Sequence, residues 1–127
     1  MPKTSKDYME AADAVVPKLS SEEAVARYNQ GGDALFIDVR DSADIEKSGT
    51  IKDGKRLPRG LMEFAADPET ALYRDYLTPE KEIYLICGAG GQAALAGKTL
   101  KDMGFSNVTN IGGFPGWKEA GGPTEEG

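Results

Sequence analysis

The fold is decided by residues 81–92, which read Lys81-Glu82-Ile83-Tyr84-Leu85-Ile86-Cys87-Gly88-Ala89-Gly90-Gly91-Gln92. Residues 83–86 combine β-branched and aromatic side chains, which is typical of a strand buried on both faces of a parallel sheet. Apolar side chains then recur at helical spacing over residues 93–103. A buried strand, a turn of small residues and a helix in this order predict a parallel α/β sheet.

Cys87 lies between the predicted strand and the predicted helix, at the position where such sheets bind ligands. Glycine at three of the next four positions lets the backbone turn its N–H groups inward, as an anion-binding nest. The helix adds free N–H groups and the positive end of its dipole, so both fields favour a thiolate. Cys87 is therefore predicted to be a reactive nucleophile. A lone cysteine that ends an apolar strand can also be a plain core residue, and this interpretation stays open.

The composition excludes several kinds of catalytic site. The chain of 127 residues is long enough for one domain with a real core, and it contains one cysteine and no histidine. A Ser-His-Asp triad, a Cys-His pair, a CxxC redox pair and a metal site built from histidines or several thiolates are thus excluded. Catalysis by Cys87 would have to use backbone dipoles and nearby cations, without a metal.

The charge of the chain argues against two classes of partner. Fifteen Lys and Arg against 21 Asp and Glu give a net charge of -6, with no basic cluster. Nucleic acid and anionic membranes are poor partners for such a surface. The first residues lack the apolar segment of a signal peptide, and a single cysteine suits a reducing compartment. We therefore expect a cytoplasmic location.

The remaining residues predict an N-terminal extension, one domain and a tail. Residues 1–14 read as a helical extension, residues 15–120 as the domain and residues 121–127 as a loose, glycine-rich tail. Ser20 with Glu23 forms a capping box, so a helix should begin at Ser21 and end at the following pair of glycines. Further strands are expected at residues 34–39, 56–57 and 108–111, and short helices at 42–46, 61–64 and after residue 112. Residues 68–77 are expected to form a short helix or a helical turn.

Three charged residues lie at or just after the ends of predicted strands and are candidates for the edge of the Cys87 site. Asp38 and Arg40 project from the same side of one strand, at its carboxyl end. They either border the site or form a structural contact, in which Asp38 accepts loop N–H groups or pairs with a cation; we favour the structural contact. Arg59 comes just after Pro58 and is either a further residue of the site edge or a solvated cation.

The chain resembles a single-domain rhodanese, of the rhodanese-like sulfurtransferase family, over about residues 15–120. Four segments carry the resemblance in the order typical of the family: LFIDVRD at residues 35–41, GTIKDGKRLPRG at 49–60, ICGAGGQAA at 86–94 and NVTNIGGFPGW at 107–117. The resemblance implies an α/β rhodanese-like fold, a small parallel β-sheet flanked by helices on both faces.

The resemblance also implies an activity. Rhodaneses move a sulfane sulfur from thiosulfate or a low-molecular-weight persulfide to cyanide or a thiol, which can belong to a protein. Cys87 matches their nucleophile, which carries the sulfur as a covalent persulfide without any further cofactor. The residues that match the binding loop are Gly88, Ala89, Gly90, Gly91 and Gln92.

Departures from the family pattern keep two alternatives open. Gly88 and Gln92 stand where family loops often carry basic residues, so we also consider a non-catalytic binding or sulfur-sensing module. Arg59 and Lys98 are expected to compensate partly for the missing cations. A phosphatase of the same fold ranks low, because its loop would need an arginine where Ala93 stands.

Overall fold

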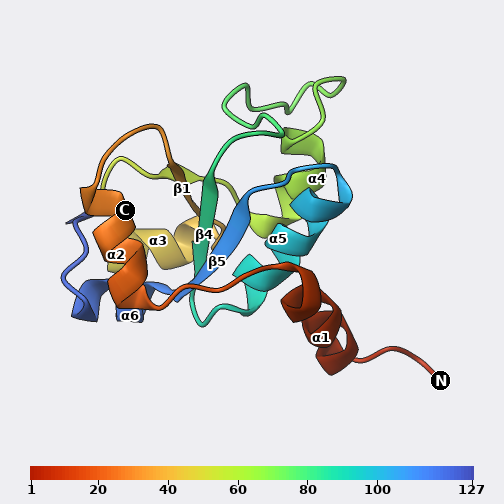
Figure 1. Cartoon of the computed structure of the whole chain (residues 1–127), viewed down its shortest axis with the longest axis horizontal. Helices are drawn as coiled ribbons and strands as arrows, with labels where there is room; N and C mark the ends of the chain where they lie inside the picture. Colours follow the sequence, from red (N-terminus) through yellow and green to blue (C-terminus); the bar gives the residue numbers. More distant parts are fainter.

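The computed structural model describes all 127 residues and has a four-stranded parallel sheet at its centre (Figure 1). The strands are β1 (Leu35–Asp38), β3 (Lys55–Arg56), β4 (Ile83–Cys87) and β5 (Val108–Gly113). They pair in the order β3-β1-β4-β5, and every pair is parallel. The predicted α/β sheet flanked by helices is confirmed.

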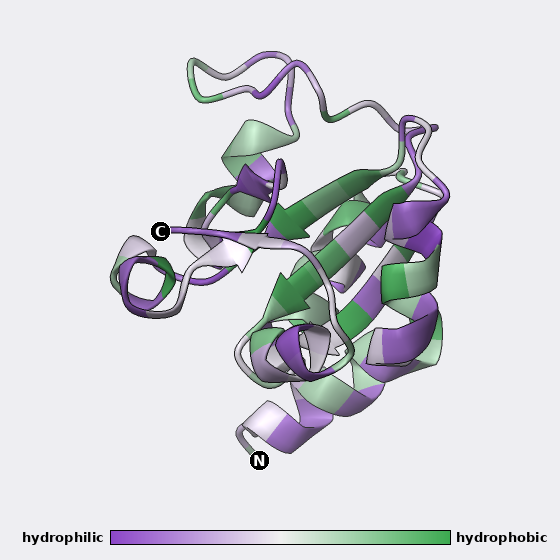
Figure 2. Cartoon of the chain, turned by 90° about the vertical axis from the view of Figure 1, so that its left-hand side faces the viewer, coloured by the Kyte–Doolittle hydropathy of each residue, from purple (hydrophilic) through white to green (hydrophobic).

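Every residue of the two central strands, β1 and β4, is buried, as their apolar sequences predict. Because side chains alternate along a strand, β4 feeds two cores. Ile83, Leu85 and Cys87 belong to the larger one, whereas Tyr84 and Ile86 belong to the smaller one. The long central strands are accordingly among the most hydrophobic parts of the ribbon in Figure 2. Cys87 is thus the last residue of its strand and belongs to the larger core.

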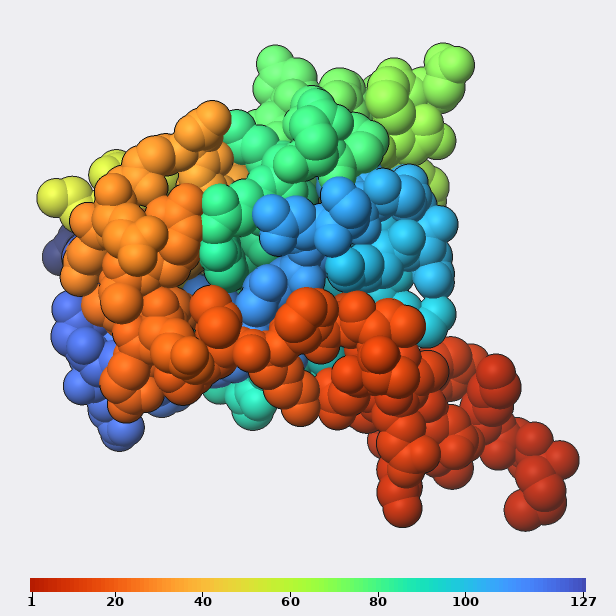
Figure 3. All heavy atoms as spheres, viewed as in Figure 1, coloured from red at the N-terminus to blue at the C-terminus, as the bar shows by residue number.

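Helices cover the two faces of the sheet. One side carries η1 (Arg59–Leu61), α4 (Met62–Ala65) and α5 (Gly91–Asp102), and the other carries α2 (Ser21–Asn29) and α6 (Phe114–Glu119). The short helix α3 (Ser42–Ser48) follows β1, and the N-terminal helix α1 (Ser5–Val15) packs against α5. Figure 3 shows the N-terminal segment standing out from the body of the molecule.

The helix starts differ in how they are capped. In α2, Ser20 Oγ accepts from Glu23 N and Glu23 Oε1 accepts from Ser20 N, both at 3.1 Å, so the predicted capping box is present. In contrast, α5 begins after Gly90, which has a φ of 98° and gives no side-chain cap. The helix begins at Gly91, two residues before the predicted start. The prediction missed these two residues because a glycine and a glutamine do not contribute to the apolar pattern on which it rested.

Residues 68–77, predicted to form a short helix or a helical turn, do not form a helix. This segment forms a series of turns instead, in the long connection that leads to β4 (Figure 1). Thr70 N donates to Asp67 O at 3.1 Å and Leu77 N to Arg74 O at 3.0 Å, so its bonds span three residues. Leu77 is buried but Leu72 is exposed, so the segment lacks the continuous apolar face that stabilises a helix.

The tail is also held more firmly than the sequence suggests. Strand β6 (Thr124–Glu125) pairs antiparallel with β2 (Thr50–Ile51), and Glu125 Oε1 accepts from Asp53 N at 2.7 Å. The buried Trp117 donates through Nε1 to Pro123 O at 3.0 Å. Residues 121–127 are therefore not loose, because their partners lie far away in the sequence. No helix in the structure is both long enough and apolar enough to cross a bilayer.

Candidate active site

A pocket of about 580 Å³ opens beside the carboxyl ends of β1 and β4. The predicted loop supplies five of its lining residues: Cys87, Gly88, Ala89, Gly91 and Gln92. Two further elements supply the other walls, since α3 and the turn before it contribute Arg40, Asp44, Lys47 and Ser48, and α6 contributes Phe114 and Pro115. The pocket thus lies where ligands bind in open α/β sheets.

The sulfur of Cys87 accepts two backbone hydrogen bonds. Gly90 N lies 2.9 Å and Ala93 N 3.3 Å from Sγ, so the loop and the first turn of α5 both direct an N–H at it. Cys87 is only 1% exposed, although it forms part of the pocket wall. Backbone donors of this kind can stabilise negative charge that develops on a sulfur atom.

Additional N–H groups of the loop remain available to a ligand. The N–H groups of Gly88 and Ala89 have no acceptor within the chain. The first N–H groups of an α-helix also lack intrahelical partners, and the positive end of the α5 dipole points to the same place. The pocket can therefore hold a small anion or a second, negatively charged sulfur beside Sγ.

The path of the loop depends on a glycine of another strand. A Cβ added to Gly113 would collide with the carbonyl oxygen of Gly88, because β5 passes close to the loop at that point. The absence of a side chain at Gly113 therefore permits the close approach of two backbones.

Asp38 and Arg40 form a buried ion pair. Asp38 is 1% exposed and accepts from Arg40 Nε at 3.1 Å, from Arg40 Nη2 at 2.8 Å and from Thr50 Oγ1 at 2.8 Å. Arg40 lines the pocket, whereas Asp38 lies behind it. The geometry agrees with the structural interpretation of Asp38, which pairs with a cation.

The guanidinium of Arg40 has little freedom to move toward a ligand. Besides Asp38, it donates from Nη1 to Ser48 Oγ and from Nη2 to Gly49 O, both at 2.8 Å. Its Cζ also lies 4.7 Å from the centre of the Phe114 ring. Arg40 is therefore a fixed wall of the pocket whose charge is largely balanced by Asp38.

The two cations expected to compensate for the neutral loop lie elsewhere. Arg59 donates to Glu63 at 3.1 Å and to Thr99 at 3.0 Å, so its side chain lies along the flank of α5. Lys98 pairs with Asp102 at 2.8 Å. Neither residue lines the pocket, and the placement of Arg59 at the site edge was wrong because η1 directs it toward α5.

Sequence reasoning missed the residues that α3 and α6 bring to the pocket. Lys47 lines it and forms no ion pair, while Asp44 stands one turn earlier on the same helix. A signal was available, because a helix that directly follows a parallel strand begins at the carboxyl edge of the sheet. The structure contains no group of acidic, cysteine or histidine side chains that could bind a metal ion.

Comparisons with known proteins agree with this geometry. A family model, the rhodanese-like domain, matches residues 20–120. The chain is 29% identical over 110 residues to the "Putative sulfur carrier protein YrkF" of Bacillus subtilis, a match that covers 87% of the chain. The chain spans about half the length of that curated relative, 54%.

Two solved structures are similar along most of the chain. The first is a Rhodopseudomonas palustris protein of unknown function, described as a possible tyrosine phosphatase, with a TM-score of 0.91 and 34% identity; the match covers 98% of this chain and 99% of that one. The second is a polysulfide-sulfur transferase homodimer of Wolinella succinogenes, with a TM-score of 0.74 and 31% identity; the match covers 96% and 87%.

Proposed function

The chain belongs to the rhodanese-like domain family, and we propose that it is a sulfurtransferase that carries a sulfane sulfur as a persulfide on Cys87. Family membership and the similarity to a sulfur transferase support sulfur transfer at the level of the family. One observation supports the assignment to Cys87: its Sγ lies at the wall of a pocket and accepts hydrogen bonds from the backbone N–H groups of Gly90 and Ala93.

The reaction consists of two displacements at sulfur. The Cys87 thiolate attacks the outer sulfur of the donor, a new S–S bond forms, and the donor leaves as sulfite or as a thiolate. The acceptor, cyanide or a thiolate, then attacks the outer sulfur of the Cys87 persulfide and releases the Cys87 thiolate. Formation and discharge of a covalent intermediate predict ping-pong kinetics.

The loop is suited to the persulfide stage. A terminal sulfur on Cys87 bears a negative charge, and the N–H groups of Gly88 and Ala89 are without acceptors in the chain. These groups and the start of α5 supply fixed dipoles that need no rearrangement when the charge arrives. No cofactor or metal is required for either displacement.

The charges of the pocket favour a persulfide donor over thiosulfate. The charge of Arg40 is balanced by Asp38, and Asp44 opposes the single free cation, Lys47. Gly88 and Gln92 add no charge to the loop. A doubly charged donor therefore gains little here, whereas a low-molecular-weight persulfide of lower charge density fits the volume of about 580 Å³.

Two alternatives are weaker. The low exposure of Cys87, 1%, favours a module that binds or senses sulfur without passing it on. The possible tyrosine phosphatase among the similar structures raises phosphate chemistry, but Ala93 contributes only a backbone N–H where that chemistry needs an arginine.

Intact mass after incubation with glutathione persulfide, with thiosulfate and then with cyanide tests the proposal. We expect a gain of one sulfur that is lost on addition of cyanide with release of thiocyanate, and no gain in Cys87→Ser. Absence of a gain with either donor would leave the non-catalytic module. Hydrolysis of a generic phosphoester that depends on Cys87 would instead support a phosphatase.

A further inference from the structure

We infer that Asn110 is a positioning residue for the sulfur-binding loop, in which its side-chain amide holds Gly90 so that the Gly90 N–H points at Cys87 Sγ. The inference rests on the proposed role of Cys87 and adds a residue from a different strand to that site. Asn110 lies in β5, and its side chain does not line the pocket that contains Cys87.

Asn110 is a buried polar residue whose backbone already has partners. It is 4% exposed. Its N–H donates to Pro17 O at 2.9 Å and its carbonyl accepts from Leu19 N at 3.1 Å, so the segment between α1 and α2 runs alongside it. A buried amide side chain needs hydrogen bonds of its own, and those of Asn110 go to the loop and to the end of β5.

The two bonds of the side chain require a donor at one end and an acceptor at the other. Nδ2 donates to Gly90 O at 3.1 Å, and Oδ1 accepts from Gly112 N at 2.8 Å. The partners are a carbonyl and an N–H, so they determine the orientation of the amide. The side chain of Asn110 thereby connects the carboxyl end of β5, at Gly112, to Gly90, the residue that precedes α5.

Gly90 needs such a restraint because glycine has access to many backbone conformations. Gly90 has a φ of 98°, and its N–H lies 2.9 Å from Cys87 Sγ. Its carbonyl accepts from Ala94 N at 3.0 Å as well as from Asn110. Apart from Cys87 itself, Asn110 is the one side chain that bonds any residue from 88 to 93. Its amide is therefore the tertiary contact that holds the sulfur-directed N–H in place.

Two substitutions separate position from charge. Asn110→Leu removes both bonds and adds no charge, whereas Asn110→Asp keeps the acceptor, loses the donor and places a carboxylate against Gly90 O. The matched control is Asn107→Asp, since Asn107 is exposed and stands just before β5. The charged residues that face the Cys87 pocket, Arg40, Asp44 and Lys47, are the same in all variants.

The readout is the pH dependence of Cys87 alkylation by iodoacetamide, which reports the thiolate without requiring sulfur transfer. We expect the midpoint of the rate curve to move to higher pH in both Asn110 variants, with a rate at neutral pH lower by about tenfold, the effect of one hydrogen bond. Asn107→Asp should leave the curve unchanged. A shift of the alkylation midpoint in Asn110→Asp but not in Asn110→Leu would show a charge effect and would overturn the inference. Unchanged rate curves in both variants, if they fold, would overturn it as well.

A measurement on the unaltered chain covers the case in which the Asn110 variants do not fold. We expect the side-chain amide NMR signals of Asn110 to move when Cys87 is alkylated, and those of Asn107 to stay in place. Stationary Asn110 signals would contradict the inference. Sulfur loading of the unaltered chain tests the proposed function separately, so the two failures are distinguishable.

Discussion

At the scale of single residues, the hydrogen bonds to Cys87 Sγ come from the backbone and not from side chains. The sulfur accepts from Gly90 N and Ala93 N, and no charged side chain bonds it. The same reliance on the backbone explains why neutral residues at positions 88 and 92 are compatible with the site. A loop without charged side chains supplies no long-range attraction for an anionic donor. Lys47 is the one cation of the pocket that forms no ion pair, because Arg40 is paired with Asp38.

Lys47→Gln should therefore affect anionic donors in particular. We expect the KM for thiosulfate to rise about threefold at low salt with little change in kcat, the size typical of a single exposed charge. The difference should shrink at high salt. The matched control is Lys6→Gln, which lies on α1 outside the pocket. Equal effects of the two substitutions on KM would rule out a specific role of Lys47.

Gly90 and Gly88 provide a second matched pair. Gly90 has a φ of 98° and a Cβ added there would lie 3.6 Å from Gly112 Cα, whereas nothing lies within 4 Å of a Cβ at Gly88. We expect Gly90→Ala to lower the free energy of unfolding by about 1 kcal/mol because of its left-handed backbone, and Gly88→Ala to leave it nearly unchanged. Urea denaturation measures both, and similar losses in the two variants would be evidence against a backbone origin.

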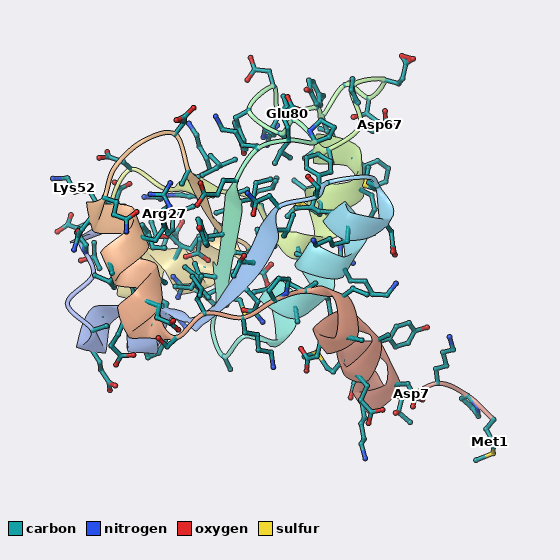
Figure 4. All side chains as sticks on the ribbon, in the orientation of Figure 1. Met1, Asp7, Arg27, Lys52, Asp67 and Glu80 are labelled. Atoms are coloured by element: carbon teal, nitrogen blue, oxygen red, sulfur yellow. The ribbon has the colours of Figure 1, made fainter.

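At the scale of elements, an ion pair connects α2 to the start of β4. Arg27 donates from Nε to Glu82 Oε2 at 2.7 Å and from Nη2 to Oε1 at 3.0 Å, and Tyr84 also donates to Glu82. Figure 4 shows Arg27 on α2, on the side of the molecule away from α1. These contacts orient the strand that ends in Cys87.

The pair makes the stability of the chain depend on pH in a defined direction. Hydrogen bonds from Arg27 and then Tyr84 hold the pKa of Glu82 below its usual value, against the opposing effect of burial. A carboxyl whose pKa is lower in the folded than in the unfolded chain stabilises the fold at pH values above its unfolded pKa, which is about 4.3 for glutamate. This stabilisation is lost as the pH falls through the lower pKa of the folded chain.

Glu82→Gln should thus destabilise the chain at neutral pH, and its difference from the unaltered chain should narrow in acid. Denaturant unfolding at several pH values measures this. Glu80→Gln is the control, because Glu80 is exposed and forms no ion pair. A difference that stays constant with pH would show that the charge of Glu82 is not the cause.

At the scale of the whole molecule, contacts between residues far apart in sequence attach both ends of the chain to the domain. The C-terminal residues pair with β2 and accept from Trp117, and α1 packs against the helix that begins at the loop. Neither contact is visible in local sequence patterns.

Removal of residues 121–127 tests the contribution of the tail. The deletion eliminates β6 and leaves the buried Trp117 Nε1 without Pro123 O. We expect the free energy of unfolding to fall by about 2 kcal/mol, because a buried donor loses its acceptor and a strand pair is lost. Replacement of residues 1–3 by one methionine is the control, since these residues are exposed and precede α1. An unchanged Tm in the tail deletion would contradict this view.

The sequence by itself determined the features that depend on neighbouring residues. An apolar run, a cysteine and three glycines within nine residues were enough to place a strand, a tight loop and a helix, because each is stabilised by local backbone geometry. The capping box of Ser20 and Glu23 is local in the same sense. The parallel sheet was expected from the alternation of strands and helices, whereas the strand order β3-β1-β4-β5 came from the tertiary structure.

Only the tertiary structure decided which side chains meet at the pocket. Arg59 and Lys98 had the right charge for the site, yet their contacts with Thr99 and Asp102 hold them outside it. Lys47 and Asn110 reach the loop region from elements that are distant in sequence. Such contacts depend on how elements pack, and a packed position is set by the whole core instead of by the residues next to it in the chain.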